Sequence, residues 1–136
     1  MKIHATSSFD VTGWEQASYD DGVAGPALSR ATVRKAFTGD LSGDSTAELL
    51  MCQADTSDLG AGAGYVASER VTGRLGDREG TFVIQHWGVS VGGNQSAGGH
   101  VVPGSGTGDL AGLTGDIVIS VDPAGAHTLT LDYEIG

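Results

Sequence analysis

The sequence has almost none of the residues that cross-link small proteins or carry them into membranes. One cysteine among 136 residues, Cys52, excludes an intrachain disulfide and a cysteine-based zinc site. No apolar run is long enough to span a bilayer. The first residues, Met1 to Ala5, lead directly into polar sequence, so we expect no signal peptide and a cytoplasmic protein.

Basic residues are also scarce. Seven Lys and Arg residues stand against 17 Asp and Glu residues, which gives a net charge of −10. A surface of this sign repels phosphate groups, so we expect neither nucleic acid nor an anionic membrane as a partner. Prolines number three and glycines 23, without a fixed short period, so the chain is not collagen-like. The length predicts a single domain over residues 1–136.

The pattern that is present most clearly is the alternation of a β-hairpin from Gly64 to Ser90. Its first arm places the polar side chains of Ser68, Arg70, Thr72 and Arg74 on one face. Its second arm places Phe82, Ile84 and His86 on one face. The turn is expected at Gly76–Glu79, with Asp77 and Arg78 as a two-residue loop.

This turn sets a register in which Glu69 faces His86, Val71 faces Ile84 and Gly73 faces Phe82. A three-residue loop would instead bring Gln85 opposite Glu69. In the preferred register Glu69 and His86 point inward, while Trp87 points outward with the apolar Val89 beside it. An outward tryptophan predicts a subunit contact, so we expect a homo-oligomer, with a dimer preferred.

The remaining chain predicts short strands and almost no helix. Two loops are expected, Glu15–Pro26 and Asp55–Gly62, and a third, Gly104–Gly112, holds at most one helical turn. The register of the 27–54 hairpin stays open, and both of its arms have some helical propensity. Seven or eight strands at this spacing indicate a sandwich or a barrel. The expected strands outside the hairpin are His4–Trp14, Ala27–Thr38, Ser45–Ala54, Ala97–Val102, Ile117–Val121 and His127–Tyr133.

Three patterns suggest a cofactor or metal site, but each lacks the residues or the spacing that such a site requires. The glycines of Gly104–Gly108 are followed by Asp109 where a dinucleotide loop needs glycine, and no Lys follows for a nucleotide triphosphate loop. Asp40–Glu48 has its glycine at the wrong position for a calcium loop. We therefore expect no cofactor. The four histidines are far apart in sequence, so we expect no metal site; they are His4, His86, His100 and His127.

Two pairs of charged or titratable residues remain. Lys35 is expected to face Glu48 across the first hairpin as an exposed ion pair of little energetic value. Glu69 and His86 are the candidate catalytic pair, because an inward carboxylate and imidazole can exchange a proton near neutral pH. The alternative is a buried pair that only fixes the register. We expect a ligand cavity around them, lined by Tyr65, Val71, Phe82, Ile84, Met51 and Phe37.

Three runs of sequence resemble a bacterial family of uncharacterised small proteins. They are Glu69–Gly73, Gly80–His86 and, most specifically, Val101–Leu113, which reads VVPGSGTGDLAGL. That family is similar in fold to allene oxide cyclase. The resemblance covers nearly the whole chain and implies an all-β, eight-stranded, antiparallel closed barrel with an internal cavity, often in an oligomer. It implies no catalytic set.

Two functions fit these expectations. The first is a cofactor-independent isomerase or cyclase that acts on a small, largely apolar molecule, with Glu69 and His86 as proton acceptor and donor. The second is a barrel that binds or steers a small ligand without chemistry of its own. The identity of the ligand is open in both.

Overall fold

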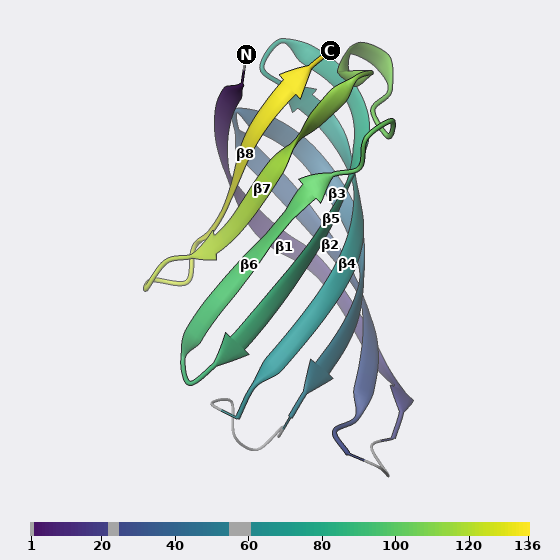
Figure 1. The fold of residues 1–136 in the computed structure, drawn as a ribbon, viewed down its shortest axis with the longest axis vertical. Helices are drawn as coiled ribbons and strands as arrows, with labels where there is room; N and C mark the ends of the chain where they lie inside the picture. The colour runs from purple at the N-terminus through teal and green to yellow at the C-terminus, as the bar shows by residue number, and fades with distance from the viewer. Residues whose placement is uncertain (1, 22–24, 55–60) are drawn as a thin grey trace.

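The computed structural model describes residues 2–21, 25–54 and 61–136, whose strands form one closed antiparallel barrel. Each strand pairs with its neighbours in chain order, and the last strand pairs with the first (Figure 1). The eight-stranded barrel expected from the sequence is confirmed. Its strands are β1 Ile3–Asp20, β2 Leu28–Gly39, β3 Leu41–Gln53, β4 Ala63–Leu75, β5 Arg78–Val91, β6 Asn94–Val101, β7 Leu113–Val121 and β8 His127–Ile135.

The alternation of buried and exposed residues explains why the ambiguous segments form strands. In β2 the buried positions are Ala31, Val33, Lys35 and Phe37, with a period of two. The segments with helical propensity, 27–38 and 45–54, are therefore strand for most of their length. Among the described residues, the single helical element is a short turn, η1 Gly108–Leu110. Within the residues that the structure describes, no helix could cross a membrane.

The first strand is longer than the sequence predicted. The expected loop from Glu15 is wrong at its start, because β1 continues in register with β2 up to Asp20. A bulge between Val11 and Gly13 adds one residue to β1, which reverses its alternation. Trp14 is thereby paired with the inward-facing Val33. The second expected loop, Asp55–Gly62, lies mostly outside the described residues.

The two ends of the barrel differ. At one end the loop that follows β6 folds over the opening and inserts Leu110, which is fully buried, into the core. The loop is held by a hydrogen bond from Thr107 N to Thr81 O (2.8 Å). A Cβ at Gly106 would lie 1.9 Å from Leu110 O, so glycine is required there. The glycine-rich run therefore closes the barrel.

At the other end the barrel is open along one seam. β6 and β7 pair only over Gly98–His100 and Asp116–Val118. Every other neighbouring pair is in register over at least seven residue pairs. Figure 1 shows β6 and β7 diverging below this contact. A lateral gap in the hydrogen-bonded wall results.

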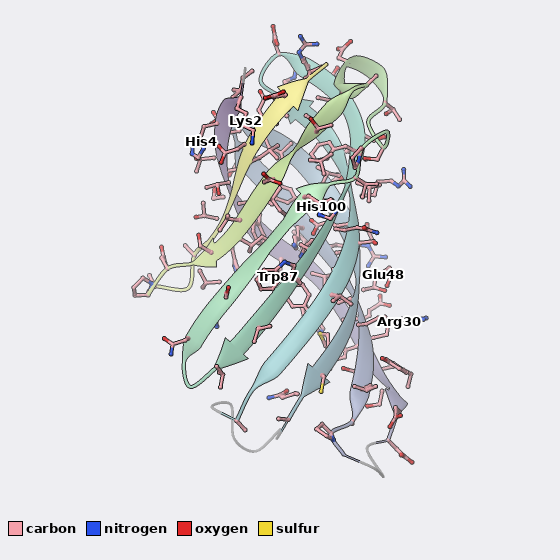
Figure 2. All side chains as sticks on the ribbon, in the orientation of Figure 1. Lys2, His4, Arg30, Glu48, Trp87 and His100 are labelled. Carbon is pink, nitrogen blue, oxygen red and sulfur yellow. The ribbon has the colours of Figure 1, made fainter. Side chains whose placement is uncertain are left out.

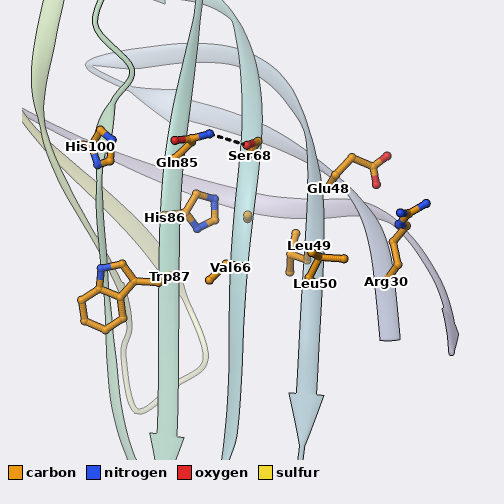
Figure 3. Close-up of a pocket in the computed structure, with 11 residues that line it drawn as sticks. Arg30, Glu48, Leu49, Leu50, Val66, Ser68, Gln85, His86, Trp87 and His100 are labelled. Atoms are coloured by element: carbon orange, nitrogen blue, oxygen red, sulfur yellow. Dashed lines mark hydrogen bonds between the residues drawn. The ribbon is translucent and has the colours of Figure 1, made fainter. Parts of the chain in front are cut away.

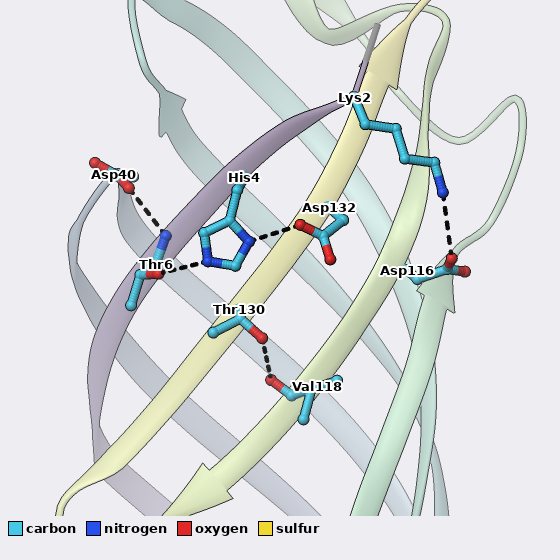
Figure 4. A network of polar contacts seen from close by, with 8 residues as sticks. All are labelled: Lys2, His4, Thr6, Asp40, Asp116, Val118, Thr130 and Asp132. Atoms are coloured by element: carbon cyan, nitrogen blue, oxygen red, sulfur yellow. Dashed lines mark hydrogen bonds and ion pairs between the residues drawn. The ribbon is translucent and has the colours of Figure 1, made fainter.

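Hydrogen bonds and ion pairs between outward side chains run across β1, β7 and β8 (Figure 4). His4 Nδ1 lies 2.6 Å from Asp132 Oδ1, and Lys2 Nζ lies 3.9 Å from Asp116 Oδ2. Asp40 Oδ2 accepts a hydrogen bond from Thr6 N (2.9 Å). His4 is exposed on the outer wall, away from the interior.

The register of the β4–β5 hairpin differs by two residues from the expected one. Leu75 pairs with Arg78, so the two-residue loop is Gly76–Asp77. Gly76 has φ +63° at the first loop position, which is a feature of type II′ turns. Glu69 therefore faces Ile84, and His86 faces Ala67. The predicted direct pairing of Glu69 with His86 is wrong, although both side chains still face inward.

Candidate functional site

A buried chain of polar contacts crosses the middle of the barrel. Glu69 is fully buried, and its Oε1 accepts hydrogen bonds from Lys35 Nζ (2.9 Å) and His86 Nε2 (2.8 Å). Its Oε2 accepts one from Ser45 Oγ (2.6 Å). On the other side of the imidazole, His86 Nδ1 lies 2.9 Å from the Tyr65 hydroxyl. Glu69 and His86 meet diagonally across the ladder, which is within reach of long side chains.

Lys35 and Ser45 are the members of this network that sequence reasoning missed. The expected partner of Lys35 was Glu48, but Glu48 pairs with Thr32, and Lys35 pairs with Ser45. The Lys35 side chain is 8% exposed, and its ammonium lies 4.6 Å from the centre of the Phe9 ring. The alternation of β2 places Lys35 on the inward face between two apolar residues, and this pattern could have identified it as a buried residue.

The charges of Glu69 and Lys35 balance within this buried series of contacts. Burial by itself raises the pKa of the Glu69 carboxyl, but the hydrogen bond from His86, the Lys35 charge and the Ser45 hydroxyl together lower it to about 2. Glu69 is thus an anion at neutral pH, matched by the Lys35 cation. Burial, with a smaller effect of the Glu69 charge, raises the pKa of the Tyr65 hydroxyl to about 12.

These charge states determine the direction of the hydrogen bonds. An ionised carboxylate only accepts, so His86 Nε2 carries a proton and donates it to Glu69. When the imidazole is neutral, its second nitrogen is an acceptor, and the Tyr65 hydroxyl then donates to His86 Nδ1. The result is a carboxylate, an imidazole and a hydroxyl in series, the arrangement by which a carboxylate orients an imidazole as a base toward a hydroxyl.

Tyr65 and His86 form part of the wall of an internal cavity of about 590 Å³ at the open end. This volume is ordinary for a small-molecule site. A smaller cavity of about 360 Å³ shares five of its lining residues and extends to the mouth. The main cavity also touches both sides of the β6–β7 seam, at 95–97 and 118–121. Its lining also includes Phe9, Val33, Lys35, Leu49, Met51, Ile119 and His127.

The structure separates the expected ligand-binding residues into two groups. Tyr65 and Met51 line the cavity together with His86. Four others are packed in the main core cluster and are absent from the lining; they are Val71, Phe82, Ile84 and Phe37. Glu69 is not in the lining either, because His86 and Lys35 lie between its carboxylate and the cavity.

A concavity of about 740 Å³ lies on the outer wall and shares Leu49 and His86 with the lining of the main cavity (Figure 3). Leu50, Val66 and Trp87 stand opposite one another on β3, β4 and β5, and each is 44–56% exposed. Arg30 and Glu48 project outward from the wall at its edge (Figure 2). The expected outward position of Trp87 is confirmed. We name the row Leu50, Val66 and Trp87 the outer apolar row.

Metal ligands do not gather anywhere in the described part of the chain. In residues 2–21, 25–54 and 61–136 no three His, Cys, Asp or Glu side chains lie close enough to hold an ion. Cys52, which is part of the wall of the smaller cavity, is a free thiol.

Comparison with known proteins adds a family and a fold. A family model described as "Protein of unknown function (DUF3224)" matches residues 5–133. The crystal structure of a DUF3224 protein of unknown function from Shewanella oneidensis MR-1 is similar to this chain, with 34% sequence identity and a TM-score of 0.85. The similarity covers 100% of this chain and 99% of that one. No curated protein matches the chain.

Proposed function

We propose that this chain, which belongs to the DUF3224 family, is a cofactor-independent isomerase or cyclase for a small, largely apolar molecule bound in the open end of its barrel. The observation that carries the proposal is the unbroken series of hydrogen bonds from Glu69 through His86 to the Tyr65 hydroxyl on the cavity wall. The sequence resembles a family that is similar in fold to allene oxide cyclase, and relatives of that fold include cofactor-free cyclases.

In this proposal the proton moves between Tyr65 and His86. A C–H proton of the substrate passes to the Tyr65 oxygen while the hydroxyl proton of Tyr65 passes to His86 Nδ1. The substrate keeps the electron pair of the broken C–H bond as a carbanion or enolate. The same two protons then return in reverse, with delivery to a different carbon, so the substrate is isomerised without net gain or loss of atoms.

Glu69 holds and stabilises the imidazole and does not itself take the proton. Because its pKa is about 2, the carboxylate stays ionised while His86 becomes an imidazolium. A fixed anion 2.8 Å from Nε2 favours that cation. Tyr65, whose pKa is about 12, is a neutral hydroxyl at physiological pH and does not leave a buried phenolate behind. General acid–base catalysis of this kind contributes roughly 10²–10⁴-fold.

The shape of the cavity contributes the rest of the proposed rate acceleration. Apolar walls hold a flexible substrate in one folded conformation, which lowers the entropic cost of ring closure or double-bond migration. The gap between β6 and β7 gives such a molecule a route in from the side of the barrel.

A second candidate is a barrel that binds a small ligand and performs no chemistry. The mutual neutralisation of Lys35 and Glu69 favours it, because a balanced buried pair needs no catalytic role to persist. Both candidates use the same cavity, and they differ only in whether Tyr65 and His86 exchange protons with the ligand.

Deuterium incorporation separates the two candidates. The protein is incubated in D₂O with a panel of enolisable ketones and unsaturated carbonyl compounds that fit the cavity, and the mass of each compound is followed. We expect the wild type to speed exchange on at least one bound compound and Tyr65→Phe to abolish this. Gln85→Ala, an outward change on the same strand as His86, is the matched control. Binding without exchange across the panel would favour the second candidate.

A further inference from the structure

The Lys35 ammonium has more donors than the protein uses. It carries three N–H bonds. Among the described residues it makes one hydrogen bond, to Glu69 Oε1, and one contact with the face of the Phe9 ring. Lys35 is 7% exposed and forms part of the cavity wall. A donor therefore remains for a molecule inside the cavity, and a buried cation of this kind favours an oxygen acceptor.

We infer that Lys35 binds a neutral carbonyl oxygen, and that the ligand of this cavity is a ketone, an aldehyde or an ester. This inference rests on the proposed binding of a small, largely apolar molecule at the open end. It adds to that proposal the chemical group that the protein recognises and the residue that recognises it.

A neutral acceptor fits this position better than a carboxylate. Lys35 is already neutralised by Glu69, 2.9 Å away. A carboxylate on the same ammonium would bring a second anion close to Glu69, which is fully buried, and like charges at short range repel strongly in such surroundings. The net charge of −10 for the whole chain adds to this cost. A carbonyl oxygen accepts the same hydrogen bond without that repulsion.

The position of Lys35 also suits the proposed proton transfer. Lys35 Nζ and His86 Nε2 contact the same oxygen of Glu69, at 2.9 and 2.8 Å, so the two nitrogens lie within 5.7 Å of each other. Tyr65 contacts the other nitrogen of the imidazole and lines the same cavity as Lys35, so one ligand can contact both side chains. As the C–H proton leaves, negative charge moves onto the carbonyl oxygen, where the ammonium stabilises it.

Three probes of similar shape test the inference without any chemistry. Benzophenone has a carbonyl and no hydrogen on the adjacent carbons, diphenylmethane has a methylene in place of the carbonyl, and diphenylacetate adds a carboxylate. Calorimetry with the wild type is expected to show benzophenone binding about tenfold more tightly than either of the others, the size expected of one hydrogen bond from a charged donor. The infrared stretch of the bound carbonyl is expected to shift to lower frequency.

The variant Lys35→Met with Glu69→Gln removes both charges together and keeps the cluster neutral, so that folding is preserved. We expect it to bind benzophenone and diphenylmethane equally and to lose the infrared shift. Arg34→Met, on the neighbouring outward position of β2, is the matched control and is expected to leave both unchanged.

Equal affinities in the wild type would overturn the inference, and so would a preference for the ketone that survives in the double variant. Tightest binding of diphenylacetate would identify a carboxylate ligand instead, and failure of all three probes to bind would exclude the site. If the protein prefers the ketone but catalyses no deuterium exchange on the panel of enolisable compounds, the carbonyl-binding inference is supported and the proposed isomerase function is refuted.

Discussion

Removal of Lys35 alone tests how the buried chain of charges is held. Lys35→Met leaves the Glu69 carboxylate fully buried, without the cation 2.9 Å from its Oε1. Breaking a buried ion pair from one side costs about 3–5 kcal/mol, because the remaining charge is uncompensated. We expect a loss of that size in the free energy of unfolding at neutral pH.

The pKa of Glu69 reflects Lys35 together with His86, Ser45 and the burial of the carboxyl. Its fall from 4.5 to about 2 means that the folded protein favours the ionised carboxyl by about 3 kcal/mol, against the opposing effect of burial. Lys35→Met removes a charge and one of three hydrogen bonds from this carboxyl and leaves its burial in place. The pKa of Glu69 then rises, so the destabilisation should shrink as the pH falls and the carboxyl becomes protonated.

Urea unfolding of the wild type, the two single variants and the double variant forms a cycle that isolates the interaction. We expect Lys35→Met with Glu69→Gln to be more stable than Lys35→Met alone. The exposed pair Arg74–Glu79 on the β4–β5 hairpin (3.3 Å) is the control, and Arg74→Met should cost under about 1 kcal/mol. Strictly additive costs at Lys35 and Glu69, or a Lys35→Met variant as stable as the wild type, would refute the reasoning.

Three further outcomes are expected. The folded pKa of Glu69 lies below its ordinary value, so its contribution to the free energy of unfolding is present above about pH 4.5 and is lost as the pH falls toward 2. Glu69→Gln should therefore flatten this part of the plot of stability against pH, and an unchanged slope would contradict the assignment. Gly88→Ala would place a Cβ 2.4 Å from Tyr65 Cε1, so the nitrogen NMR signals of His86 should shift, whereas Gly98→Ala, whose nearest contact is 3.5 Å, should leave them unchanged. We propose that the outer apolar row forms a homodimer contact, so Trp87→Glu should lower the sedimentation coefficient at high micromolar concentration; a monomeric wild type would dismiss this proposal.

The faces of the strands could be predicted from the sequence. Alternation placed Glu69, His86 and Tyr65 inside and Trp87 outside, and the structure agrees at each of these positions. Side chains repeat with a period of two along a strand, so an error of two residues in register leaves the face unchanged. The predicted register of the β4–β5 hairpin was wrong by two residues. Glu69 and His86 nevertheless contact each other, diagonally across the ladder.

Features set by more than one strand could not be predicted. The bulge between Val11 and Gly13 turns Trp14 toward the inward face, and no local pattern in β1 signals an added residue. Lys35 was assigned to Glu48 because opposite charges on adjacent strands suggest a pair. Its actual partner is on β4, two strands away, and the two side chains meet across the inward face of β3.

Height along the barrel axis explains why four expected cavity residues lie in the packed core. Alternation reports whether a side chain faces inward, but not whether the interior at its level is filled or empty. Phe82 and Ile84 come soon after the β4–β5 turn, and their end of the barrel is plugged by Leu110 from the glycine-rich loop. His86 is two residues further along β5 than Ile84, and the cavity wall includes it but not Ile84. Because strands cross a barrel at a tilt, the boundary between plug and cavity falls at a different residue in each strand. Tyr65 and His86 stand at that boundary, where a buried charge network and an open cavity meet.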